Sequence, residues 1–469
     1  MDRGGKAFRI FFWTFAFVLF CFTALRYEGH WYVYGVFSAA FNLLLWMGLR
    51  EGRIFFDTFM GILYWLGFWL KLSVRVAFLG GSFHEPTGFF DFTAQSFDHA
   101  LLVSTCGAVA LIVVSWLRER YFYTYSQSDF GTPLASLLSV YERHRRLVLG
   151  GFSFFVLVVA AVNFGFGFYQ RGSVPQTVLP FGLNAVFVWL VLFGMASFSA
   201  FLLDFEFRVG GKKSFSVVLL SLGECFLSST SMLSRGMVLN GTSLLLGLRE
   251  CLLKVGKLNG KFWLKTLLVF GVLFFLSVFM VNFIRSYTFA GKEVGQIKIG
   301  SVANVASGAK VLFIDRWVGI EGVMAVSSYP GRGWGLWKEA WNEKFKNSGT
   351  SLYDLKIIES YVGHDLSEHH FVSLPGLLAF LFYPGSFWFL FFSMLLMGGL
   401  GATIDFFVYK VGQNPVLCSL LAQVVAYRYA HFGYAPGHSY VLFAAIFLNL
   451  SLIYLGDNAC RIFWADSGR

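Results

Sequence analysis

Three arginines stand where apolar segments end, and each could meet an anionic group there. Arg235 joins two apolar segments within Ser234-Arg235-Gly236, Arg285 ends a third, and Arg316 lies in the polar stretch that follows. A guanidinium keeps its charge and pairs with phosphate oxygens through two parallel hydrogen bonds. The three together suit a diphosphate, whereas each alone could simply extend to lipid headgroups.

Two further groups of residues have a chemical interpretation beside a simpler one. His369 and His370 follow Glu368 and could supply a general base, because histidine titrates near neutral pH; alternatively they cap the next apolar segment. Trp334, Trp337 and Trp341 recur at helical spacing and predict one aromatic helix face. That face could stack on sugar rings, or it could lie among lipid headgroups, which is the simpler interpretation.

The motifs that the sequence lacks narrow the chemistry. It has no glycine-rich nucleotide motif, and Asp204-Phe205-Glu206, its closest approach to a metal-binding DxD, is predicted to face the cytoplasm. We therefore expect no cofactor and no metal. A transfer reaction without them needs an activated substrate, such as a sugar on a polyprenyl diphosphate, whose leaving group arginines can stabilise.

The composition indicates a membrane protein. Of 469 residues, 57% are hydrophobic and 13% are charged, whereas soluble domains carry roughly 25% charged residues. The net charge of +11 comes from short segments between apolar runs, which favours membrane topology over nucleic-acid binding. The six cysteines form no CxxC pair, so neither a disulfide framework nor a zinc site is expected.

Apolar runs of about 20 residues predict about twelve membrane-spanning helices in an all-α polytopic protein. They lie near 8–25, 31–49, 54–78, 99–117, 148–168, 177–203, 214–233, 236–253, 265–284, 386–408, 414–433 and 439–456. With both termini cytoplasmic, inward segments hold 21 Lys and Arg residues and short outward segments hold six, as the positive-inside rule requires. The third range contains Asp57, Lys71 and Arg75, which are costly inside a membrane.

Two elements are predicted not to span. An amphipathic segment from Leu134 to Arg146 should lie on the inner surface, where its arginines meet anionic lipid. An apolar stretch between Ser373 and Tyr383 is too short to cross and predicts a re-entrant half-helix. The chain thus divides into helices at 1–284, a large outward loop at 285–371 and further helices at 372–469.

This layout resembles the O-antigen polymerases of the Wzy type and the related O-antigen ligases. The resemblance covers the helix count and the long loop before the last helices. Locally it depends on Ser234-Arg235-Gly236, on His370-Phe371, where family members carry histidine and asparagine, and on Pro384-Gly385-Ser386.

The resemblance implies a GT-C-like glycosyltransferase at the periplasmic face of the bacterial inner membrane. It would join undecaprenyl-diphosphate-linked oligosaccharides, with a chain-length regulator as a further partner. Arg235, Arg285 and Arg316 would bind the diphosphate, His370 or His369 would be the base, and Glu321 is a second possibility.

Three other classes remain open. A ligase differs from a polymerase only in its acceptor. A transporter or flippase of lipid-linked glycans would place charged residues along a path through the membrane, often with internal repeats, and we find no such repeat in the sequence. A membrane scaffold or sensor would need no outward arginine cluster.

Overall fold

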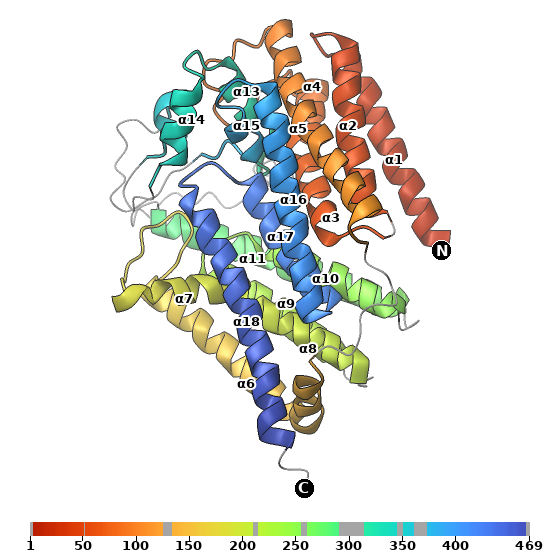
Figure 1. Cartoon of the computed structure of the whole chain (residues 1–469), viewed down its shortest axis with the longest axis vertical. Helices are drawn as coiled ribbons and strands as arrows, with labels where there is room; N and C mark the ends of the chain where they lie inside the picture. The colour runs from red at the N-terminus through yellow and green to blue at the C-terminus, as the bar shows by residue number, and fades with distance from the viewer. Residues whose placement is uncertain are drawn as a thin grey trace.

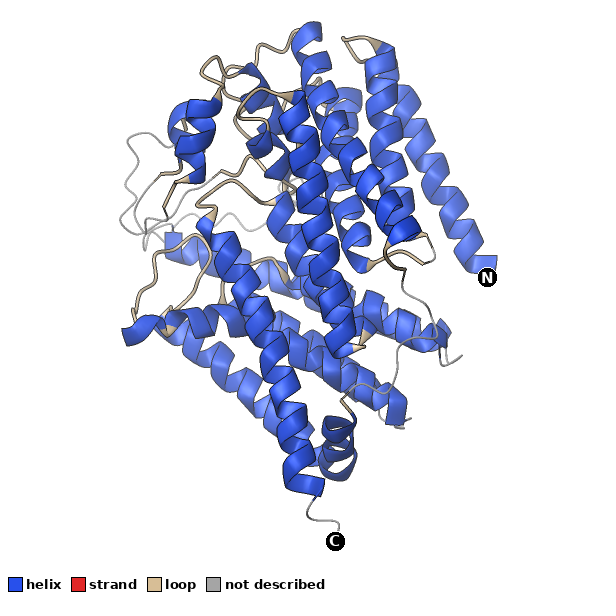
Figure 2. Ribbon diagram, viewed as in Figure 1, coloured by secondary structure: helices blue, strands red, loops and turns tan. Residues whose placement is uncertain are grey.

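All regular structure in the described part of the chain is helical (Figure 2). The computed structural model describes residues 3–50, 52–124, 134–209, 214–254, 260–289, 314–344, 350–360 and 373–465. The first helices are α1 (Arg3–Ala24), α2 (Trp31–Leu49), α3 (Phe55–Tyr64), η1 (Trp65–Leu70), α4 (Lys71–Phe78) and α5 (Ala94–Tyr121). They lie together in one part of the molecule (Figure 1).

The remaining helices complete a second group and the long connection. The second group holds α6 (Ala135–Phe166), η2 (Pro180–Gly182), α7 (Asn184–Trp189), η3 (Leu190–Gly194), α8 (Met195–Val209), α9 (Ser214–Ser231), α10 (Met237–Lys254) and α11 (Gly260–Phe289). The connection holds α13 (Ile320–Ser328), α14 (Trp334–Trp341) and η6 (Tyr353–Ile357), and the chain ends with α15 (Leu377–Leu381), α16 (Phe387–Gly412), α17 (Pro415–Ala430) and α18 (Gly437–Ala465).

Among the described residues, eight helical segments are long and apolar enough to cross a membrane, so the prediction of a membrane-embedded, all-helical protein is confirmed at that level. The eight are Trp31–Leu49, Phe55–Phe78, Ala94–Tyr121, Ala135–Phe166, Pro180–Val209, Gly260–Arg285, Phe387–Gly412 and Gly437–Ile462. Each of the twelve predicted ranges contains a helix. The helices in the other four ranges are shorter or more polar: the apolar part of α1 is Arg9–Ala24, that of α9 is Phe215–Ser231, α17 has 16 residues, and α10 carries Arg249, Glu250 and Lys254.

Helix α17 lies at the centre of the fold and joins the two groups. It packs against α3 in the first group, against α8 and α10 in the second, and against α16. Thirteen of its 16 residues are buried, which is why its sequence is apolar on every side. The segment at 372–469 is therefore not a separate unit, because α17 fills the middle of the helices at 1–284.

The three charges in the Phe55–Phe78 span are each neutralised by a partner. Asp57 accepts a hydrogen bond from Arg118 at 2.6 Å, Lys71 lies 2.9 Å from Glu321, and Arg75 pairs with Asp315. An isolated buried charge is costly, and a hydrogen-bonded pair offsets much of that cost. Two of these pairs fasten the long connection to α4.

The short helix α15 lies where the sequence predicts a re-entrant half-helix. Its five residues are all buried, and Gly376, at φ +82°, precedes it and donates its N–H to the carbonyl of Phe432 at 2.9 Å. The left-handed conformation favours glycine at this position.

The helix predicted at Leu134–Arg146 is present as the first part of α6, and a kink at His144 (φ −116°, ψ 26°) separates it from the rest of α6. Its position on the inner membrane surface stays a prediction. Arg145 has a partner within the protein, because it donates two hydrogen bonds of 2.7 Å to the buried carboxylate of Glu206. A buried carboxylate needs such a partner to offset the cost of its burial.

We expect Gly322→Ala to destabilise the protein by on the order of 1–3 kcal/mol, the usual cost of overpacking. A Cβ at Gly322 would overlap the carbonyl oxygen of Pro375, so α13 and α15 could no longer approach each other closely. Thermal unfolding in detergent measures the change. Gly335→Ala is the control, because a Cβ at that position in α14 meets nothing; equal destabilisation by both changes would contradict this account.

Candidate functional site

The three arginines singled out in the sequence lie close together, although they come from distant parts of the chain. Arg235 lies in the turn between α9 and α10, Arg285 near the end of α11, and Arg316 just before α13. Arg316 Nη2 donates a 2.6 Å hydrogen bond to the carbonyl oxygen of Arg235. The charges of Arg235 and Arg316 are both near enough to act on Arg285.

A fourth arginine, Arg171, completes this group, which we call the arginine cluster (Arg171, Arg235, Arg285 and Arg316). Its carbonyl oxygen accepts a 2.8 Å hydrogen bond from Arg285 Nη2, and its Nη1 donates to the hydroxyl of Tyr427 at 3.2 Å. Arg171 is one of the six Lys and Arg residues in the short segments predicted to face outward. Its position in a short loop, at the same predicted membrane boundary as Arg235, was the signal that could have selected it.

The loop that carries Arg171 is fixed to the turn that carries Arg235. The backbone N–H of Arg171 donates to the carbonyl of Met232 at 2.9 Å. Asn163, fully buried, donates to the carbonyls of Tyr169 and Ser231 at 3.1 Å each. These bonds hold two arginines together before any ligand binds, which is the preorganisation that an anion site needs.

Three of the four arginines in the cluster have no carboxylate partner among the described residues. Arg171, Arg235 and Arg316 form no ion pair with an acidic residue in the described ranges, whereas Lys71, Arg75 and Arg118 all do. The Nε of Arg235 is buried and has no hydrogen-bond partner there. Burial lowers the pKa of Arg316, and the charges of Arg235 and Arg171 lower it further.

Such an arrangement favours an anionic ligand over a structural role. Uncompensated buried charges are costly, and the cost is relieved when an anion with several oxygens binds. Backbone carbonyls accept hydrogen bonds from Arg285 and Arg316. A carbonyl positions a guanidinium without cancelling its charge, so the cluster keeps its attraction for phosphate.

Tyr427 and His431 border the cluster at the end of α17. The phenol of Tyr427 accepts the hydrogen bond from Arg171, and its ring is stacked on the imidazole of His431 with 3.9 Å between centroids. His431 was not among the candidate residues predicted from the sequence. It follows a helix that ends at the predicted outward boundary, where Arg235 and Arg285 also lie, and this shared position could have identified it.

The candidate bases from the sequence lie elsewhere. His369 and His370 lie outside the described residues. Glu321 is 3% exposed and forms a buried ion pair with Lys71, whose Nζ lies 2.9 Å from one carboxylate oxygen and 3.0 Å from the other. Both carboxylate oxygens of Glu321 are therefore engaged by Lys71, so the side chain has a structural role in fastening α13 to α4.

The predicted aromatic helix face is present, and part of it is covered by other aromatic side chains of the protein. Trp337 packs on Phe380 and Phe389, with ring centroids 5.0 and 5.1 Å apart. Trp334 and Trp341 are 59% and 41% exposed. Only these two of the three tryptophans present a free surface for a sugar ring or for lipid headgroups.

We expect Trp337→Ala to lower the free energy of unfolding by about 2 kcal/mol, somewhat less than for a fully buried aromatic residue. Trp334→Ala should leave stability nearly unchanged, because its ring is mostly exposed, and should weaken sugar binding severalfold. Thermal unfolding and glycan binding by the purified protein separate the two effects. Unchanged glycan binding by Trp334→Ala would favour the headgroup interpretation.

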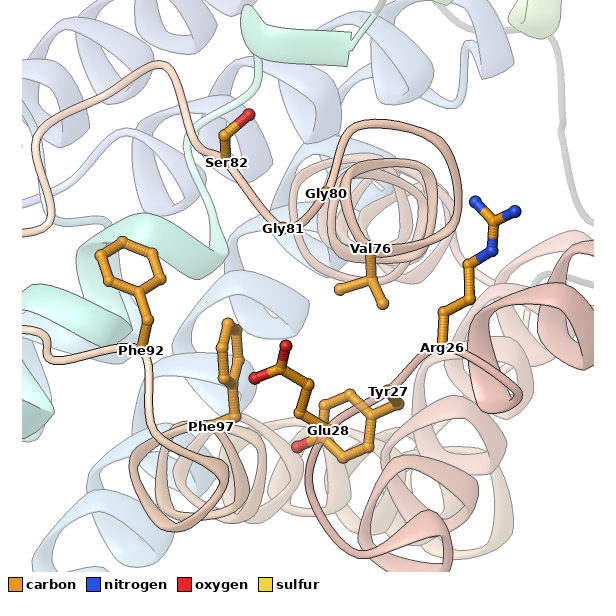
Figure 3. Close-up of a pocket in the computed structure, with 9 residues that line it drawn as sticks. All are labelled: Arg26, Tyr27, Glu28, Val76, Gly80, Gly81, Ser82, Phe92 and Phe97. Carbon is orange, nitrogen blue, oxygen red and sulfur yellow. The ribbon is translucent and has the colours of Figure 1, made fainter.

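An open cavity of about 480 Å³ lies away from the arginine cluster. Its lining comes from the α1–α2 turn, the end of α4 and the start of α5: Arg26, Tyr27, Glu28, Val76, Gly80, Gly81, Ser82, Phe92 and Phe97. Figure 3 shows Val76, Glu28 and Phe97 pointing toward its middle. It holds an acidic and a basic side chain, so it does not select an anion, and the cluster remains the better candidate for a diphosphate.

Among the described residues, no group of three His, Cys, Asp or Glu side chains gathers as a metal-ligand set. Comparison of the chain with known family models, curated proteins and solved structures finds no match. The geometry and chemistry of the arginine cluster are therefore the basis for the function proposed below.

Proposed function

We propose that this protein is a glycosyltransferase that polymerises oligosaccharide repeat units linked to undecaprenyl diphosphate. The observation that carries the proposal is the arginine cluster: four guanidiniums gathered from four separate segments, of which Arg171, Arg235 and Arg316 have no carboxylate partner in the described chain. A diphosphate offers several oxygens to such a group. Its charge increases as the sugar leaves, so the cluster stabilises the transition state more than the bound substrate.

The proposal includes a topology. All twelve predicted ranges cross the membrane in a GT-C-like arrangement, with both termini in the cytoplasm and the 285–371 loop in the periplasm of the bacterial inner membrane. The distribution of 21 inward against six outward Lys and Arg residues in short segments supports this orientation. The cluster then faces the periplasm, where a lipid-linked glycan reaches it from the outer leaflet.

The experiment is reconstitution of the purified protein with lipid-linked repeat units, without nucleotide or metal. A ladder of products that differ by one repeat unit is the expected result. A requirement for a nucleotide sugar would contradict the proposal. A chain-length regulator, the further partner that we propose, should change the length of the ladder and not its formation.

The alternatives give different results. A ligase transfers finished glycan to a lipid A core acceptor and builds no ladder. A flippase moves a labelled lipid-linked glycan across the bilayer and leaves its length unchanged. In a deletion strain, one repeat unit on each core indicates a lost polymerase, and bare core indicates a lost ligase.

A further inference from the structure

We propose that His431 is the general base that takes the proton from the acceptor hydroxyl during this transfer. The inference rests on the proposed function and identifies the base that it needs. It depends on the position of the imidazole at the end of α17, where the ring is stacked on Tyr427, the partner of Arg171.

The orientation of the imidazole leaves one nitrogen ready to accept a proton. His431 Nδ1 lies 3.1 Å from the carbonyl oxygen of Tyr427. A carbonyl oxygen can only accept, so Nδ1 must carry a hydrogen and donate it. In the neutral ring, Nε2 then holds the lone pair, which is the tautomer that a general base requires.

The ring is also fixed in place. Its stacking on Tyr427 leaves only 24° between the two ring planes, and the backbone N–H of His431 donates to the carbonyl of Tyr427 at 3.0 Å. Tyr427 in turn accepts the hydrogen bond from Arg171. One residue of the proposed diphosphate site and the proposed base are therefore linked through a single tyrosine.

The surroundings of His431 favour the neutral ring. Arg171, Arg316 and Lys71 are the cations close enough to act on the imidazole, and positive charges disfavour its protonated form. Lys71 is already paired with Glu321, so Arg171 and Arg316 are the members of this group that a ligand can neutralise. A bound diphosphate supplies that negative charge and makes His431 more basic. The base thus becomes effective when the donor substrate is present.

In the proposed step, Nε2 of His431 accepts the hydroxyl proton of the acceptor sugar. The hydroxyl oxygen forms a bond to the anomeric carbon of the donor glycan. The bond between that carbon and the diphosphate oxygen breaks, and undecaprenyl diphosphate leaves with the electron pair. The arginine cluster holds the departing anion, and the proton later passes from the imidazolium to solvent or to the diphosphate.

The test compares His431→Gln with His438→Gln and His370→Gln in the reconstituted full chain. His438 is an exposed histidine at the start of α18 and serves as the control. Two quantities are measured: the rate of ladder formation and the affinity for inorganic pyrophosphate. Removal of a general base lowers a rate by about 10²–10⁴-fold.

We expect His431→Gln to slow transfer by that factor and to leave pyrophosphate affinity within about twofold, while His438→Gln changes neither. Transfer by the wild type should also rise with pH, and that dependence should be lost in the variant. Normal transfer by His431→Gln together with a large loss in His370→Gln would overturn the proposal. An equal loss of rate and pyrophosphate affinity would also overturn it, because it indicates a structural role.

A second measurement covers the case in which His431→Gln does not fold. In ¹³C-histidine NMR spectra, one resonance of the wild type should stay neutral at pH 5 and titrate at higher pH once pyrophosphate is added. His431→Asn identifies that resonance. No effect of pyrophosphate on any histidine would sink this inference, whereas a wild type that builds no ladder would sink the proposed function itself.

Discussion

Replacement of Arg235 by glutamine should reduce glycan transfer on the order of 100-fold and leave the protein as stable as before. The guanidinium of Arg235 makes no ion pair in the described chain, and its Nε has no hydrogen-bond partner there. Its removal therefore costs the fold little and relieves a half-buried charge that has no ion-pair partner in the described chain.

The size of the effect follows from the bonds to the ligand. Charge-assisted hydrogen bonds contribute about 1.5–3 kcal/mol each, and 1.4 kcal/mol corresponds to about tenfold in affinity or rate. Two such bonds to a diphosphate therefore account for a 100-fold loss. The measurements are the rate of ladder formation, the affinity for pyrophosphate and the midpoint of thermal unfolding.

Arg332→Gln is the matched control. Arg332 is also half-buried and forms no ion pair in the described ranges, but it donates to the carbonyl of Tyr329 at 3.1 Å and lies over the ring of Phe382. We expect nearly normal transfer from this variant. Equal losses of transfer rate in the two variants would contradict the role of the cluster, because they would show that transfer depends on the net positive charge of the protein and not on the position of Arg235.

Removal of either partner of the Lys71–Glu321 pair should destabilise the protein by about 3–5 kcal/mol, the usual cost of leaving one buried charge alone. Both side chains are almost completely buried, at 1% and 4% exposure, so water cannot solvate the charge that remains. Lys71→Met and Glu321→Gln both provide the test, with unfolding in detergent as the measurement.

The double variant Lys71→Met with Glu321→Met should recover most of the lost stability, because two apolar side chains of similar volume replace the pair. It also decides what Glu321 does. If Glu321 only fastens α13 to α4, the double variant transfers glycan at close to the normal rate. A folded double variant without activity would restore Glu321 as a candidate base.

The positions of the helices were predictable because the signal for them is local. A run of apolar residues partitions into lipid and satisfies its own backbone hydrogen bonds whatever the rest of the chain does. Each of the twelve predicted ranges contains a helix. The short helix α15 lies between Gly376 and Pro384, two residues that favour helix ends. The partner of Arg145 was not predictable in this way, because Glu206 lies on α8, 61 positions away in the sequence.

The chemical roles of the charges were only partly predictable. Arg235, Arg285 and Arg316 were selected one by one for their positions at segment ends, and the structure brings them together. Arg171 and His431 were missed because their significance depends on neighbours from other segments, Tyr427 above all.

The sequence by itself determined that this is a helical membrane protein with arginines at the ends of its apolar segments. Only the tertiary structure decided which charges are neutralised. Glu321 looked available in the sequence, yet it pairs with Lys71, 250 positions away, whereas Arg171, Arg235 and Arg316 find no acid among the described residues. Hydrophobic partition acts residue by residue along the chain, but charge compensation depends on distances between distant segments.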